Sequence, residues 1–294
     1  MRRPSPWLCS SAVVAALLAG GCTSEEPAAD TDRIVVNPPA EGADHTHAPG
    51  ESDADPVGDG TRASAGGYRI ADLRVPTRTD GPGEMSFRIL GPEGRPVTDY
   101  AEQQTKLMHL YVVRTDFSVY RHVHPTLADD GTWTVPVDLA EAGGYRVIAD
   151  FLPSDADRPV VLGKQVLQPP AGAPRPVPRE GEGTDGSVRV RVDGAGRVGA
   201  DGRLRLVVST PDGRPVTLGS YLGTTAHVSG FRIADRARDQ LFVHVHPYGE
   251  PEITDDGAEL TFHTAFERAG DYRLFVQVRV DGIVHTVPIT ATIT

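Results

Sequence analysis

The sequence predicts an all-β protein in which two tandem immunoglobulin-like β-sandwich modules follow a signal peptide and a disordered tether. The string His-Val-His-Pro occurs at residues 122–125 and again at 244–247, which indicates an internal duplication. Around each copy, short runs of alternating apolar and polar residues are separated by Gly, Pro and Asp clusters, a pattern typical of β-sandwiches. Neither copy contains the periodicity of an amphipathic helix.

Residues 1–22 have the order of an export signal, with two arginines, an apolar run and then small residues. The apolar run of about 12 residues is too short to cross about 30 Å of hydrocarbon. The segment Leu-Ala-Gly-Gly-Cys at 18–22 resembles a bacterial lipobox. That resemblance implies that Cys22 becomes the first residue, carries lipid and holds the exported protein on the outer face of the cell membrane. A cleaved signal without lipid is the alternative.

Two segments have the composition of connections. Residues 23–66 are rich in Ala, Pro, Gly and acidic residues, so they cannot bury enough apolar surface to fold and are predicted to form an acidic tether. Within it, His45 and His47 offer a loose pair for metal capture, with a solvated linker as the alternative. Residues 169–185 are rich in Pro and Gly, which favours a semi-rigid spacer.

The remaining stretches, 67–168 and 186–294, align with each other. Gly-Arg-Pro-Val-Thr occurs at 94–98 and at 213–217, before the repeated histidine string in each copy. After that string, residues 142–146 match 269–273, where the tyrosine resembles the tyrosine corner of sandwich folds and is interpreted as structural. Order and spacing are kept, so two copies of one module are expected.

Each module is expected to contain seven strands, because it contains seven runs of alternating or β-branched residues bounded by turn residues. In the first module these runs are 68–75, 85–90, 106–114, 119–124, 132–139, 145–151 and 160–167. In the second they are 188–192, 204–209, 225–233, 241–246, 260–266, 272–280 and 283–293.

Three histidines of the first module are expected to meet on one hairpin. Side chains alternate along a strand, so His122 and His124 share a face. If residues 115–118 form the turn, His109 lies directly opposite His124, at a Cβ separation of about 4.5–5.5 Å. Leu110 and Val123 would then face the core, and the imidazoles would lie on the opposite, open face of the sheet.

The second module gives an independent check of this register. Its histidine pair is His244 and His246, and its upstream histidine is His227. The loop is longer by an even number of residues, which preserves the facing of the side chains. Val228 then opposes Val245, as Leu110 opposes Val123.

Imidazoles at this spacing are a plausible divalent metal site, for Cu(II) or Zn(II). The only cysteines are Cys9 and Cys22, both in the export segment, so nitrogen and oxygen atoms are the ligands on offer. The net charge of −11 argues against a nucleic-acid partner. No GxSxG, phosphate-loop or HExxH motif is present, and no enzyme activity is expected.

The strings Met-His-Leu-Tyr-Val-Val at 108–113, Tyr-Arg-His-Val-His-Pro at 120–125 and Gly-Gly-Tyr-Arg-Val-Ile-Ala-Asp-Phe at 143–151 resemble the repeat unit of uncharacterised secreted bacterial lipoproteins, common in actinobacteria. These proteins are often labelled heavy-metal-binding or related to small periplasmic β-sandwich proteins of copper handling. The resemblance implies one three-histidine cluster per module: His109, His122, His124, His227, His244 and His246. The second module departs from the pattern at Ser229, where the first has Tyr111.

Three functions follow from these observations. The leading hypothesis is a lipid-anchored cell-envelope protein that buffers copper or zinc or delivers it to an envelope metal-handling partner. The second is a non-catalytic envelope scaffold whose histidines are structural. The third is an analogy to the three-histidine zinc site of carbonic anhydrase, against which stand the absence of an identifiable general base and the expected open sheet face.

Overall fold

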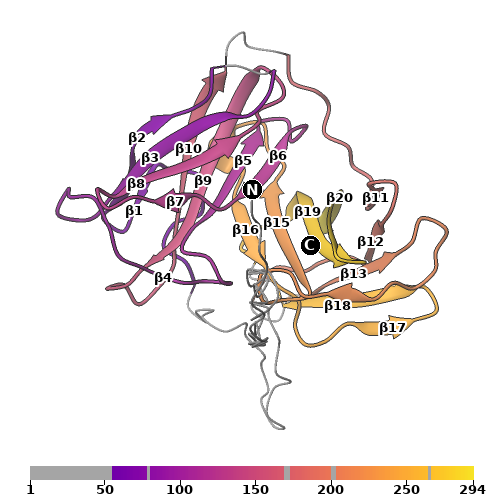
Figure 1. The fold of residues 1–294 in the computed structure, drawn as a ribbon. Coiled ribbons are helices and arrows are strands. Elements are labelled where there is room, and N and C mark those ends of the chain that lie inside the picture. The colour runs from indigo at the N-terminus through magenta and orange to yellow at the C-terminus, as the bar shows by residue number, and fades with distance from the viewer. Residues whose placement is uncertain (1–54, 78–79, 169–172, 200–202, 264–265) are drawn as a thin grey trace, which may run out of the picture. The chain divides into compact units, whose positions relative to one another are not determined.

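The computed structural model describes residues 55–77, 80–168, 173–199, 203–263 and 266–294 (Figure 1). Across these ranges the fold is all-β, with one short 3-10 helix, η1 (Ala237–Asp239). None of the described residues forms a helix long and apolar enough to cross a membrane. The export segment, Cys22, His45 and His47 lie outside the described residues, so the expectations about them stay predictions.

The first module consists of two antiparallel sheets. One has the strand order β1-β2-β3-β8-β7, and the other has β10-β9-β5-β6 with β4 added to β9. Their bounds are β1 (Ser64–Ala65), β2 (Tyr68–Arg74), β3 (Gly83–Leu90), β4 (Tyr100–Ala101), β5 (His109–Arg114), β6 (Tyr120–Val123), β7 (Thr126–Leu127), β8 (Thr132–Val137), β9 (Gly143–Pro153) and β10 (Val160–Gln168).

The second module repeats this topology. One sheet has the order β11-β12-β13-β18-β17, and the other contains β14, β15, β16 and β20 around the long strand β19. The bounds are β11 (Glu182–Thr184), β12 (Arg189–Asp193), β13 (Arg203–Ser209), β14 (Leu218–Gly219), β15 (Ala226–Arg232), β16 (Phe242–Val245), β17 (Glu252–Thr254), β18 (Gly257–His263), β19 (Gly270–Val280) and β20 (Ile283–Ile293).

Each sandwich closes over its own apolar core. In β3 the alternation places Met85, Phe87 and Ile89 inside, as a strand with one buried face requires. Trp133 of β8 is fully buried in the same core. The second core is built from aliphatic residues with Phe and Tyr, and it includes Leu204, Leu206, Leu260 and Phe262.

All fourteen expected runs contain a strand, and the two-module sandwich prediction is confirmed. The structure adds six strands of two or three residues: β1, β4, β7, β11, β14 and β17. Pairing also extends into both segments expected to be connections. Val57 forms a parallel bridge with Val160 inside the expected tether, and β11 lies inside the expected linker, paired with β12.

The two tyrosines at equivalent positions of the repeat act as tyrosine corners, as expected. The single hydroxyl hydrogen of Tyr145 is shared between the carbonyl oxygens of Leu139 and, at 2.6 Å, of Glu141. The hydroxyl of Tyr272 donates to the carbonyl of Arg268 at 2.8 Å. Each hydrogen bond fixes the loop that precedes the long central strand.

A third apolar cluster joins the modules. It contains Tyr111, Val113 and Ile148 from the first module and Phe231, Phe242 and Phe275 from the second. Strands β5 and β9 are therefore buried on both faces, one against the sandwich core and one against the other module. The expectation that the imidazoles lie on an open sheet face is wrong, because the second module covers that face.

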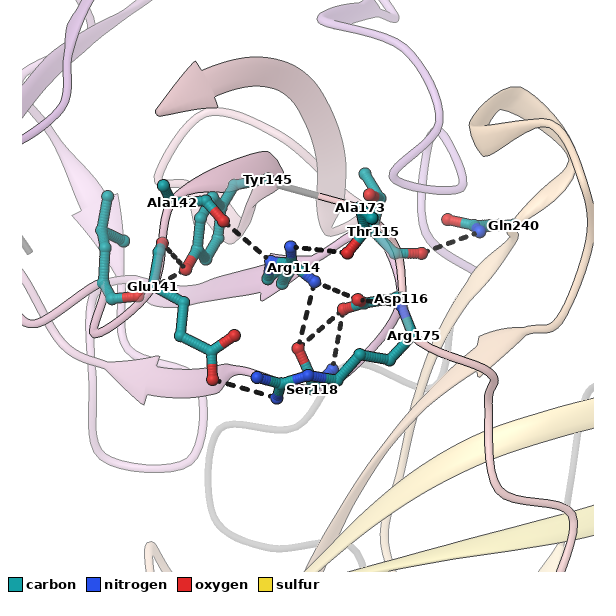
Figure 2. Close-up of polar contacts among 11 residues, drawn as sticks. Arg114, Thr115, Asp116, Ser118, Glu141, Ala142, Tyr145, Ala173, Arg175 and Gln240 are labelled. Carbon is teal, nitrogen blue, oxygen red and sulfur yellow. Dashed lines mark hydrogen bonds and ion pairs between the residues drawn. The ribbon is translucent and has the colours of Figure 1, made fainter. Parts of the chain in front are cut away.

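A buried polar network around Arg114 fastens the linker to the same interface (Figure 2). Arg114 forms an ion pair with Asp116, and the side chains of both are at most 5% exposed. The carboxylate of Asp116 also accepts the backbone N–H of Arg175 at 2.7 Å. Beside it, Gln240 of the second module donates to the carbonyl of Thr115 at 3.4 Å.

Candidate metal centre

The first triad lies at the end of the β5–β6 hairpin. His109 is the first residue of β5, His122 lies in β6, and His124 follows β6 immediately before Pro125. The observed pairing of Leu110 with Val123 is the expected register, which brings the three imidazoles to one side. A ligand nitrogen from each ring lies within 4.8 Å of the other two.

The second triad repeats the arrangement with tighter spacing. Val228 pairs with Val245, again as expected. Nδ1 of His227, Nε2 of His244 and Nε2 of His246 are each 3.1 Å from the other two. The structure therefore brings together, in two groups of three, all six histidines that were expected as metal ligands from the sequence.

Hydrogen bonds in the first triad leave two ring nitrogens without a hydrogen. Nε2 of His109 lies 3.0 Å from the carbonyl oxygen of Gln103, and a carbonyl can only accept, so this nitrogen carries the hydrogen. Nδ1 of His122 lies 2.6 Å from Oε1 of Gln277, whose amide nitrogen donates to Thr286. In neutral rings, Nδ1 of His109 and Nε2 of His122 are then both bare lone pairs, and they face each other at 3.0 Å.

Two lone pairs at that distance repel unless a cation lies between them. Nε2 of His124 is a further unsatisfied group, since it is buried and has no hydrogen-bond partner. An unpaired buried nitrogen costs free energy, and a shared ion removes that cost for all three rings. A proton is one candidate cation and a metal ion is the other.

The burial of the rings argues against a proton as the shared cation. It lowers the pKa of His122 from 6.5 to about 4. Burial, and then the charge of a neighbouring imidazole, lowers the pKa values of His109 and His227 well below 6.5. His124 and His244 shift in the same direction for the same first reason. At neutral pH these rings are therefore uncharged, which is the form that binds metals.

The nitrogen spacing fits a metal ion. Two nitrogens that bind one zinc ion at about 2.0–2.1 Å and near-tetrahedral angles lie about 3.3–3.4 Å apart. The separations of 3.1 Å in the second triad and 3.0 Å between His109 and His122 in the first are slightly shorter. A small outward movement of the rings would accommodate the ion.

A two-residue turn beside each triad holds the upstream histidine. Gln103 pairs with Lys106 and Tyr221 with Thr224, and the intervening residues have positive φ angles. One such residue is Gly223, but its counterpart Thr105 is β-branched with φ +67°, a conformation that costs free energy for such a side chain. The turn places the Gln103 carbonyl against His109, so strained backbone supports the candidate centre.

The two triads are neighbours across the module interface. The ring centroids of His109 and His244 are 5.5 Å apart, and those of His109 and His227 are 6.2 Å apart. Two residues that sequence reasoning missed lie between the triads. Asp150 accepts a hydrogen bond from Nδ1 of His244 at 3.0 Å, and Gln277 holds His122 as described above.

Asp150 and Gln277 lie at equivalent positions of the duplicated module. Asp150 on β9 is the register partner of His109, and Gln277 on β19 is the register partner of His227. Burial raises the pKa of Asp150 from 3.8 to about 7. An acidic residue inside the apolar run Val-Ile-Ala-Asp-Phe was the sequence signal for a buried polar role.

A pocket of about 400 Å³ opens onto the second triad. Its lining includes His244, His246 and Asp150, and none of the first triad's histidines. Among the described residues, its lining contains three further carboxylic side chains, Asp55, Asp59 and Glu267, and no lysine or arginine. The pocket therefore offers a route that attracts cations toward the second triad.

A family model described as a domain of unknown function, DUF8832, matches residues 63–162 and 182–294. Among curated proteins, none matches the chain. Solved structures with some likeness include invasin, a bacterial integrin-binding protein, at 12% identity and TM-score 0.20 over 76% of this chain. Others are alpha-2-macroglobulin from E. coli, at 14% identity and TM-score 0.24 over 77% of this chain, and titin A168169, at 10%, 0.20 and 77%. The match spans 39% of the invasin chain, 16% of the macroglobulin chain and 98% of the titin chain.

Proposed function

The chain belongs to the DUF8832 family of domains of unknown function, and from its two triads we propose that it binds divalent metal ions, one per module. The first ion would be held by His109, His122 and His124, and the second by His227, His244 and His246. The observation that carries the proposal is the pair of bare nitrogens of His109 and His122, which face each other at 3.0 Å. A neutral hydrogen bond cannot explain that contact.

The donor set favours copper(II) or zinc(II), because three neutral imidazoles without thiolate or carboxylate ligands suit these borderline ions. Three ligands leave at least one coordination position open. In the second triad that position has access to the pocket with acidic walls, which supports exchange of the ion with a partner or with solution. A role in metal buffering or delivery, without catalysis, agrees with these features.

We further propose that the protein is exported and anchored by lipid on Cys22 at the outer face of the cell membrane. The support is the order of the export segment and the lipobox-like string in the sequence. The Cys22→Ala variant should lose incorporated radiolabelled palmitate and move from the membrane to the soluble fraction. Retention of both label and membrane association in that variant would overturn the anchoring proposal.

Metal binding is tested by calorimetry and by metal analysis of the soluble fragment from Thr23 onward, which lacks the lipidated Cys22 and contains every residue that the structure describes. The expected stoichiometry is two Zn(II) or Cu(II) per chain, falling to one in His122→Gln/His124→Gln. His285→Gln is the matched control, since His285 bonds Asp185 at 2.7 Å, away from both triads. If the wild-type chain binds no ion, and the double variant only lowers stability, the histidines are structural and the chain is a scaffold.

A further inference from the structure

The strongest further observation is the reciprocity of the hydrogen bonds to the two triads. His122 of the first module donates to Gln277 of the second, and His244 of the second donates to Asp150 of the first. His122 and His244 are equivalent positions of the repeat, as are Gln277 and Asp150. Each triad is therefore oriented by a side chain that the opposite module supplies.

The reciprocity is broken in one respect, which is charge. Asp150 carries a carboxyl group where Gln277 carries a neutral amide. Both side chains are buried, Asp150 at 7% exposure and Gln277 at 6%, so the difference is felt at low effective dielectric and is not screened by solvent.

A carboxylate behind a metal-bound histidine differs chemically from an amide in that position. Both accept the hydrogen bond, fix the tautomer and present Nε2 to the ion. The carboxylate also makes the imidazole a stronger donor and adds a negative charge close to the cation, and such partners typically change metal affinity about 10–100-fold. The amide supplies the orientation without the charge.

We propose that Asp150 and Gln277 are positioning residues acting across the module interface, and that they make the second triad the tighter of two unequal metal sites. This inference rests on the proposed metal-binding function. The second triad fills first, and its affinity is set by a residue of the first module. The triad of the first module binds its ion afterwards, because Gln277, the side chain that orients it, carries no charge.

The short distance between the triads acts in the same direction. With ring centroids of His109 and His244 5.5 Å apart, two divalent ions repel each other across the interface. Binding at the second triad therefore weakens the first further. The order of filling is fixed by the charge on Asp150 and reinforced by this repulsion.

The test measures Zn(II) affinity at each triad separately by competition with a chromophoric chelator at about pH 8, where the Asp150 carboxyl with its raised pKa is mostly ionised. His124→Gln leaves the second triad to be measured, and His246→Gln leaves the first. Adding Asp150→Asn, which keeps the shape and the acceptor oxygen but removes the charge, should weaken the second triad about 10–100-fold. Adding Gln277→Glu should tighten the first triad by a similar factor.

The cross-module assignment has its own control. Asp150→Asn should weaken the first triad less than the second, because Asp150 bonds only His244, and Gln277→Asn should leave the second triad unchanged within about threefold, because Gln277 orients only the first triad. A loss of folding would weaken both triads together. The visible spectrum of Co(II) in the second triad should shift in Asp150→Asn, which a purely structural role would not produce.

The outcomes separate this inference from the proposed function. Two ions bound with equal affinity, or an Asp150→Asn variant that leaves the second triad within threefold of its original affinity, overturn the inference while metal binding stands. Absence of any bound ion in the wild-type chain overturns both.

Discussion

The rings of Tyr120 and Phe275 stack face to face across the module interface, with centroids 4.0 Å apart and planes inclined by 6°. Tyr120 also donates its hydroxyl hydrogen to Oγ of Ser229 in the second module at 3.1 Å. These contacts lie next to the triads on the same strands, so docking of the modules and shaping of the candidate centre depend on the same residues.

Removing the Phe275 ring should loosen the interface between the modules. Phe275 is 4% exposed, and Phe275→Ala should lower the free energy of unfolding by about 3–5 kcal/mol, since truncation of a buried aromatic ring leaves a cavity. Urea denaturation followed by fluorescence measures the change. Ile253→Ala, at a side chain 60% exposed, serves as the control and should stay within about 0.5 kcal/mol of the parent. Equal effects of the two substitutions would contradict the assigned role of the interface.

The metal-free protein should lose stability as pH falls from 6.5 toward 4. The pKa of His122 is about 4 in the folded chain and 6.5 for an ordinary histidine in the unfolded chain. Between these two values the unfolded chain binds the proton and the folded chain does not. Stability then rises with pH by up to about 1.4 kcal/mol per unit for each such histidine. Asp150, whose pKa is raised to about 7, acts in the opposite direction, but it is one group against five lowered histidines. Denaturation in EDTA at pH 7.5 and 5.0 measures the slope, and a chain no less stable at the lower pH would refute this balance.

Breaking the buried ion pair of Figure 2 should be costly. Asp116→Ala removes the carboxylate that pairs with the buried Arg114 guanidinium and accepts the backbone N–H of Arg175. Loss of one partner of a buried pair typically costs about 3–5 kcal/mol. The linker should also become more sensitive to limited proteolysis. Glu93→Ala is the comparison, because its pair with Arg95 is 68% and 79% exposed and should contribute at most about 1 kcal/mol. Similar losses in both variants would rule out a special role for the buried pair.

Relieving the strained turn beside His109 should stabilise the chain. Thr105 has φ +67°, where the second module has Gly223 at +84°. Thr105→Gly removes about 1–2 kcal/mol of left-handed strain and adds about 0.5–1 kcal/mol of unfolded-state entropy. The expected net gain is about 0.5–1 kcal/mol, measured as an upward shift of the thermal midpoint. A fall in the midpoint would show that the threonine side chain makes a compensating contact.

The local geometry of each triad could be predicted from the sequence because strand alternation is strict. A turn at 115–118 fixes the pairing of Leu110 with Val123, and the observed register agrees. The second module passed the same test through the pairing of Val228 with Val245. Short edge strands such as β4 and β14 were missed, because two residues carry no periodic signal.

The docking of the modules was not predicted, although the sequence carried a trace of it. Strand β5 reads Leu-Tyr-Val-Val without polar alternation and is buried on both faces, which is the pattern of a strand covered on two sides. Which surface covers it depends on long-range packing, and that cannot be obtained from one strand. The orienting roles of Asp150 and Gln277 depend on the same packing.

Tyr111 and Ser229 occupy equivalent positions of the repeat, and the difference between them makes the module interface asymmetric. Tyr111 packs against Phe242 with centroids 4.8 Å apart, while Ser229 receives the hydroxyl of Tyr120, the counterpart of Phe242. The contacts are those of a self-complementary homodimer joined into one polypeptide. With a bulky ring on one half and a small hydroxyl on the other, the halves are no longer interchangeable. Two copies of the first module would bring a second phenol to the position that Ser229 occupies, so the second half of the repeat accommodates the first in a way that a copy of the first does not.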